Sequence, residues 1–96
     1  MIAVTVKVLG PLINIVGGST FPLELAPGTT IRDMLDQVFE MYGEPMIEEV
    51  MNKERTDLAP YYKILVNGRN SKLMDYMDTV LENGQVVHIM PPVAGG

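Results

Sequence analysis

The chain has 96 residues, a formal net charge of −5 and no cysteine. Its length suits one domain with a modest core, and its hydrophobic fraction of 47% indicates a globular protein, not a disordered one. The absence of cysteine excludes disulfides, thiolate metal sites and a cysteine nucleophile, while the acidic balance argues against nucleic acid and favours a partner with a basic surface.

The hydropathy pattern gives no membrane span and no secretory leader. No apolar run approaches the roughly 20 residues that a helix needs to cross a bilayer. The first residues lack a charged segment followed by an apolar one. We therefore expect a cytoplasmic protein without a membrane partner.

The first quarter of the chain predicts two strands. Hydrophobic residues alternate with small or polar ones over Ile2–Val8, and again over Phe21–Leu25. Gly10-Pro11 and Gly17-Gly18 predict a loop between the two strands. Pro22 has no backbone N–H, so the second strand is expected at an edge of the sheet.

A helix is predicted next. Thr30 followed by Asp33 is typical of a helix N-terminus, and Gly43 is a stop. The apolar positions between them recur with helical spacing at Ile31, Met34, Leu35, Val38, Phe39 and Tyr42. A shorter helix is predicted from about Pro45, with Ile47, Val50 and Met51 on one face, before a polar surface loop over 52–59.

The last third predicts a return to strands. Residues 61–67 form one strand, which ends at the tight-turn dipeptide Asn67-Gly68, and residues 69–73 form a short returning strand. Residues 74–77 give no clear pattern. After a second Asn-Gly turn at 83–84, residues 85–90 form the last strand.

This order of elements predicts an α+β fold with a mixed sheet, one main covering helix and a short extra helix. The first and last strands have the strongest apolar faces, so we expect them side by side and parallel at the centre of the sheet. Residues 1–90 are predicted to form a single domain, and residues 91–96 a flexible tail.

The tail Pro91-Pro92-Val93-Ala94-Gly95-Gly96 is the feature that bears most on function. Two glycines make the thinnest backbone that a chain can present, and the two prolines hold the segment before them extended. Such a tail can thread into a narrow site of another protein and present the Gly96 carboxylate there.

The sequence resembles the MoaD/ThiS sulfur carriers, which have the ubiquitin-like β-grasp fold. The resemblance covers most of the chain and is specific in the tail and in the Asp78–Val87 segment before it, with Ile64–Gly68 fitting the same pattern. It is strongest to the branch that provides the small subunit of molybdopterin synthase. Three departures leave the subfamily open: a long segment over 44–60, Gln85 in place of a usual Asp, which we expect to weaken a turn contact, and Ala94 in place of a common hydroxyl residue.

The resemblance implies a non-catalytic carrier whose Gly96 is adenylated and thiocarboxylated, and which then donates sulfur in molybdenum cofactor biosynthesis. It implies two partners: the large subunit of molybdopterin synthase and an adenylyltransferase like those that activate ubiquitin. ATP and Mg²⁺ would be used by the activating enzyme, with no cofactor bound to this chain. Three alternatives stay open: a ubiquitin-like modifier joined to lysines through Gly96, a carrier for another pathway such as thiamine, and an interaction module with an inert tail.

The last strand carries the candidate partner surface. Val86, His88 and Met90 alternate with Val87 and Ile89, so one set faces the helix and the other forms a stripe on the open face of the sheet. We predict that Val86, His88 and Met90 contact a partner, the alternative being a half-exposed histidine with no role. A metal role for His88 is not expected, because the pattern shows no second ligand.

The remaining charged residues predict no reaction centre. Five carboxylates on the helices fit a solvated face better than a paired acid–base site: Asp33, Asp36, Glu40, Glu48 and Glu49. Arg69 and Lys72, near the predicted turn, fit a solvated surface better than a site that steers an acidic group.

Overall fold

The computed structural model describes residues 1–92. Its five strands are β1 (Ile2–Val8), β2 (Thr20–Leu25), β3 (Lys63–Val66), β4 (Arg69–Asn70) and β5 (Val86–Met90). Its helices are α1 (Pro11–Val16), α2 (Ile31–Tyr42) and α3 (Glu44–Val50), with 3₁₀ turns η1 (Ser71–Leu73) and η2 (Tyr76–Asp78). Val93–Gly96 lie outside the described residues, so the predicted flexible tail is described only at Pro91 and Pro92.

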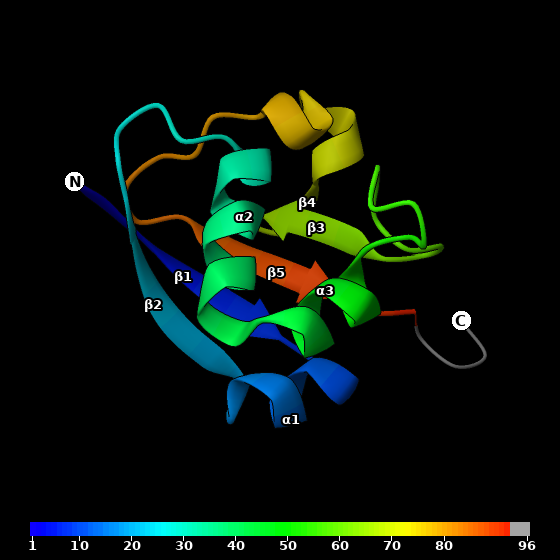
Figure 1. Ribbon diagram of the computed structural model, residues 1–96. Coiled ribbons are helices and arrows are strands. Elements are labelled where there is room, and N and C mark those ends of the chain that lie inside the picture. The colour runs from blue at the N-terminus through cyan, green and yellow to red at the C-terminus, as the bar shows by residue number, and fades with distance from the viewer. Residues whose placement is uncertain (93–96) are drawn as a thin grey trace.

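The sheet has the order β2-β1-β5-β3-β4. β1 and β5 run parallel at its centre, as predicted, and the other pairs are antiparallel. β2 is an edge strand, which agrees with Pro22. Figure 1 shows α2 crossing one face of the sheet, while β5 ends at the side of the molecule opposite the N-terminus.

The core lies between the sheet and α2. Alternate residues of β1 and β5 point into it, among them Val6, Val87 and Ile89, each 0% exposed. The predicted stripe of α2 supplies its other side, with Ile31, Met34, Leu35 and Val38 buried. The helix begins where Thr30 accepts a hydrogen bond from the Asp33 N–H at 3.2 Å, and it ends at Gly43.

The predicted loop over 10–18 is wrong, because it contains helix α1. Pro11 occupies the first turn, where its missing N–H costs nothing, and Gly17 closes the helix in a left-handed conformation. Leu12 is fully buried, and α1 packs against α3. The Gly-Pro and Gly-Gly pairs are therefore the two ends of a short helix, and residues 1–92 contain three helices where one main and one short helix were expected.

The predicted strands at 61–67 and 69–73 are too long. Tyr61 has φ +68°, which takes it out of the strand, so β3 begins at Lys63. The returning strand β4 has only two residues before η1 begins at Ser71.

The predicted polar loop after α3 is also not wholly at the surface, because Leu58 is buried in the core and pairs with Met51 through a β-bridge.

Two Asn-Gly turns hold the start of β5 in place. In the first, Asn67 and Gly68 both have positive φ, and the Asn67 Oδ1 accepts a hydrogen bond from the Val86 N–H at 2.7 Å. In the second, the Asn83 Oδ1 accepts from the Ala3 N–H at 2.8 Å. The Gln85 Oε1 accepts a hydrogen bond from the Glu82 N–H at 2.8 Å, and the weakening of a turn contact relative to Asp stays a prediction.

Candidate functional site

Strand β5 leads directly into the tail and shows the predicted alternation. Val87 and Ile89 are fully buried, whereas Val86, His88 and Met90 are half-buried on the open face of the sheet. The period-2 pattern therefore places all five side chains correctly. The contact of this stripe with a partner stays a prediction.

The neighbours of the stripe on the open face include two lysines and a leucine, with Thr5 of β1 beside Val86. Lys7 of β1 and Leu65 of β3 lie on either side of His88, and Lys63 lies beside Met90. The His88 Nδ1 is buried and has no hydrogen-bond partner within residues 1–92. The stripe thus has a lysine ammonium group on each side, and the tail follows it directly in the chain.

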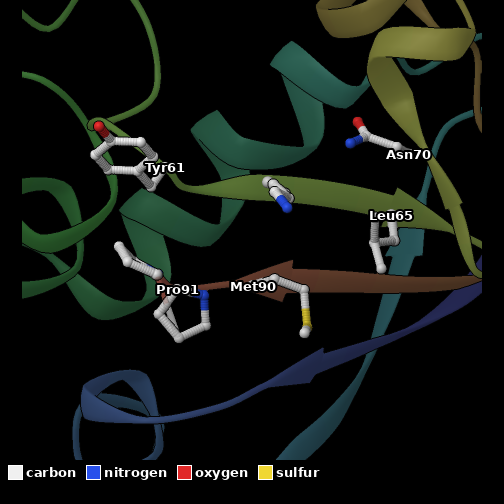
Figure 2. A pocket seen from close by; sticks show the side chains of 7 residues that line it. Tyr61, Leu65, Asn70, Met90 and Pro91 are labelled. Atoms are coloured by element: carbon white, nitrogen blue, oxygen red, sulfur yellow. The ribbon is translucent and has the colours of Figure 1, made fainter. Parts of the chain in front are cut away.

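A groove runs along this face up to the base of the tail. Its volume is about 510 Å³, and Figure 2 shows Tyr61 and Pro91 at one end, Leu65 and Asn70 at the other, and Met90 between them. Lys63 and Pro92 complete its lining. Tyr61 is 81% exposed and held in a left-handed backbone conformation, an arrangement that costs free energy and is typical of functional surfaces.

Sequence reasoning predicted only part of this groove. Leu65 and Lys63 could have been found, because they alternate with buried Ile64 and Val66 and so share a face with Met90. Tyr61 could not, because no local pattern predicts its positive φ.

Gly10 supports the base of the tail. It has φ +60° and ψ −134°, and a Cβ at this position would lie 3.3 Å from the Pro91 Cγ. Such a separation is tighter than ordinary van der Waals contact, so glycine lets the β1–α1 junction approach the proline closely. Of the six predicted tail residues, Pro91 and Pro92 are described, whereas Val93, Ala94, Gly95 and Gly96 lie outside the described residues.

Two tyrosine–carboxylate pairs lie away from the tail, and sequence reasoning missed both. The Tyr62 hydroxyl donates to Glu49 at 2.5 Å, so Glu49 belongs to a structural pair and not to a freely solvated face. The Tyr76 hydroxyl donates to Asp57 at 2.6 Å. Burial and the Glu49 carboxylate raise the pKa of Tyr62, and burial and Asp57 raise the pKa of Tyr76 to about 12.

The other predicted solvated carboxylates are exposed: Asp33, Asp36, Glu40 and Glu48. Within residues 1–92, no three histidine or carboxylate side chains cluster as metal ligands would. The same part of the chain has no helix long and apolar enough to cross a membrane. The described geometry thus concentrates its unusual features at the groove, the stripe and the base of the tail.

The sequence matches the ThiS family over residues 6–96, which includes the whole tail. The chain belongs to the ThiS family. A curated relative, a putative sulfur carrier protein of Archaeoglobus fulgidus, is 30% identical over 67 residues, which is 70% of this chain and 74% of the relative. Small archaeal modifier protein 3 of Haloferax volcanii is 42% identical over 43 residues, 45% of this chain and 47% of the relative.

Solved structures confirm the β-grasp fold of this ThiS-family chain. Small archaeal modifier protein 1 of H. volcanii superposes with a TM-score of 0.82 at 19% identity, over 97% of this chain and all of the other. A putative molybdopterin converting factor subunit 1 of Pyrococcus furiosus superposes with a TM-score of 0.72 at 23% identity, over 97% and 100% of the two chains. The predicted resemblance is therefore correct at the level of fold and family, a family of sulfur carriers and small ubiquitin-like modifiers.

Proposed function

We propose that this chain is a sulfur carrier in molybdopterin biosynthesis, with Gly96 as the residue that carries the sulfur. The observation that carries the proposal is a Pro-Pro-Val-Ala-Gly-Gly tail directly after the central strand of a ThiS-family fold. β5 is hydrogen-bonded on both sides, and Pro91 rests against Gly10. These contacts fix the point from which the tail leaves the sheet.

The chemistry follows from the poor reactivity of a carboxylate. A Gly96 oxygen attacks the α-phosphorus of ATP, which releases pyrophosphate and leaves an acyl-adenylate. The terminal sulfur of a persulfide then attacks the acyl carbon and displaces AMP. A thiol cleaves the resulting S–S bond, so a thiocarboxylate remains on Gly96 and a disulfide leaves. In this scheme the chain is a substrate, and the activating enzyme supplies ATP, Mg²⁺ and the groups that bind them.

The open face gives this carrier a surface for its partners. An apolar strip flanked by ammonium groups fits a partner that presents apolar side chains among carboxylates. We assign Val86, His88 and Met90 to the contact with the adenylyltransferase, and to the contact with the large subunit of molybdopterin synthase when sulfur is delivered. The shared fold with the P. furiosus protein named as a putative molybdopterin converting factor subunit supports this pathway.

Intact mass spectrometry tests the carrier role. After incubation with an adenylyltransferase, ATP and a sulfur donor, the chain should gain about 16 Da, because sulfur replaces one oxygen. A variant without Gly95 and Gly96 should keep its circular dichroism spectrum and gain nothing. A Gly18→Ala variant is the matched control, since a Cβ at Gly18 meets nothing within 4 Å, and it should gain the full mass. No gain in the wild type would contradict the proposal.

The pathway requires a second measurement. The loaded protein, mixed with a synthase large subunit and the pterin precursor, should lose about 16 Da as its sulfur is transferred. Transfer of the sulfur to a thiamine precursor instead would assign the carrier to the thiamine pathway. The proposed chemistry at Gly96 would then still hold.

A modifier role is the second candidate, and the similarity to small archaeal modifier protein 3 favours it. The same acyl-adenylate would then be captured by a lysine amine, which gives an isopeptide bond and releases AMP. Immunoblots of cell extracts separate the two roles. A ladder of conjugates that disappears on removal of Gly95 and Gly96 indicates a modifier, and a single free band indicates a carrier.

A further inference from the structure

A second hollow, of about 430 Å³, lies where the outer edge of β3 meets the preceding segment and η1. β4 pairs only with Leu65 and Val66, so within residues 1–92 no strand covers Lys63 and Ile64 on that side. The hollow is thus a place where the sheet is left incomplete by the shortness of β4.

A buried hydroxyl lines this hollow without a partner. Ser71 is 1% exposed, and its Oγ forms no hydrogen bond with any group in residues 1–92. A buried polar group that is not paired destabilises the fold, and native proteins retain few of them. Ser71 therefore points to a ligand that supplies the missing hydrogen bond.

Two lysines give the hollow its charge. Lys63 and Lys72 both line it, and neither has a carboxylate within 4.0 Å in the described part of the chain. The Lys72 Nζ lies 5.8 Å from the centre of the Tyr76 ring, which holds it at the hollow. Asp57 is the one acid in the lining, and its Oδ1 accepts from the Tyr76 hydroxyl and the Leu58 N–H. Its charge acts on Lys72, so the lining as a whole carries one net positive charge.

We propose that this hollow binds an acidic segment of a partner protein. A carboxylate of the segment lies between Lys63 and Lys72, and a further polar group of the segment pairs with the Ser71 Oγ. A protein segment fits better than a free small anion, because the hollow and the groove on the open face share Tyr61, Lys63 and Asn70. The groove and the hollow are therefore adjacent, so one extended segment can reach both. The inference does not depend on the chemistry of Gly96.

Nuclear magnetic resonance titration of the full chain tests this site. The probe is a short extended peptide of alternating valine and glutamate. It should shift the amide signals of Lys63, Asn70, Ser71 and Lys72, while the same peptide with glutamine for glutamate should not. Shifts confined to β1 and β2, or no saturation at millimolar peptide, would overturn the proposal. Acetate or inorganic phosphate giving the same shifts at the same concentration would overturn the protein segment as occupant.

Charge-reversal variants locate the binding. Lys63→Glu and Lys72→Glu should each weaken the peptide by at least about tenfold, since each removes a hydrogen bond to a charged group. Lys53→Glu is the matched control, because Lys53 is exposed and does not line the hollow, and it should leave the affinity unchanged. Equal weakening by all three variants would indicate general charge attraction and contradict the site.

Ser71→Ala separates a binding role from a structural one. The variant should bind the peptide more weakly while its Tm stays the same or rises, because an unpaired buried hydroxyl has been removed. A lower Tm with unchanged peptide affinity would assign Ser71 to the fold and overturn its place in the site. The mass gain at Gly96 is measured on the same variants. A variant that loses peptide binding but still gains about 16 Da at Gly96 has a defect in this site and not in the carrier chemistry.

Discussion

Gly10 is the residue against which the base of the tail packs, and its replacement should act through two separate effects. Gly10→Ala places a side chain at φ +60° and brings a Cβ to 3.3 Å from Pro91. We expect unfolding by urea to show a loss of about 1–3 kcal/mol, which combines backbone strain with the close contact. Gly17→Ala, in the milder left-handed helical conformation and with nothing within 4 Å of the new Cβ, should cost less than Gly10→Ala.

A double-mutant cycle isolates the contact between Gly10 and Pro91. In a Pro91→Ala background the Cγ is gone, so Gly10→Ala should cost less there than in the wild type. Gly10→Ala should likewise slow the loading of Gly96 more in the wild-type background than in the Pro91→Ala background, because the contact sets where the tail leaves the sheet. Equal costs in the two backgrounds would show that Pro91 does not need a glycine at this point.

Asp57 gives the protein a specific response to acid. The hydrogen bonds from the Tyr76 hydroxyl and the Leu58 N–H hold the pKa of this carboxyl below its usual value, in spite of partial burial. A group whose pKa is lower in the folded state stabilises the fold above its unfolded pKa. That stability is lost as the pH falls through the folded pKa, which lies below the ordinary value of an aspartate.

Tyr76→Phe should therefore flatten the dependence of the unfolding free energy on pH below about pH 4, because it removes the largest cause of the lowered pKa. Urea denaturation between pH 2 and about pH 7 measures this slope. Tyr61→Phe, which removes the hydroxyl of a largely exposed tyrosine, is the control and should follow the wild type. An unchanged slope in Tyr76→Phe would assign the acid response to other carboxylates.

At the scale of elements, Asn67 connects the β3–β4 turn to the strand that carries the tail. Its φ of +49° suits asparagine, and its Oδ1 accepts from the Val86 N–H. Asn67→Ala should cost about 1–3 kcal/mol in urea denaturation, since it leaves that N–H without its partner. Asn67→Asp keeps an acceptor and should retain most of the stability. A loss as large as that of alanine would show that the side-chain amide matters in another way.

The elements that the sequence predicted well are those with a repeating pattern. Alternation over Ile2–Val8 and Val86–Met90 repeats every two residues, and the stripe of α2 extends over about three helical turns, so each pattern completes more than two periods. Helix α1 was missed because six residues are too few to show a stripe, and its capping Pro and Gly are also loop residues. Tyr61 and Ser71 depend on packing between distant segments, so no local pattern indicates the groove edge or the unpaired hydroxyl.

The whole molecule separates its charges between two faces. Residues 31–57, which include α2 and α3, hold eight of the 12 acidic residues: Asp33, Asp36, Glu40, Glu44, Glu48, Glu49, Glu54 and Asp57. Within the strands of the sheet the charge balance is reversed. The strands carry three basic residues, Lys7, Lys63 and Arg69, and one acidic residue, Glu24. A net acidic protein thus presents a locally basic sheet beside its tail, and a partner with an acidic surface would meet that face first.

This separation predicts that association with the activating enzyme depends on salt and on Lys7. Lys7→Glu should slow association by about two- to fivefold at low ionic strength, because it reverses one charge beside His88, and the difference should shrink as salt shortens the Debye length below about 10 Å. Stopped-flow mixing over a range of NaCl concentrations measures it. Lys53→Glu, on the acidic side of the molecule, should associate at about the same rate as the wild type. A Lys7→Glu variant that changes only the dissociation rate would mean that Lys7 contacts the partner directly and does not steer its approach.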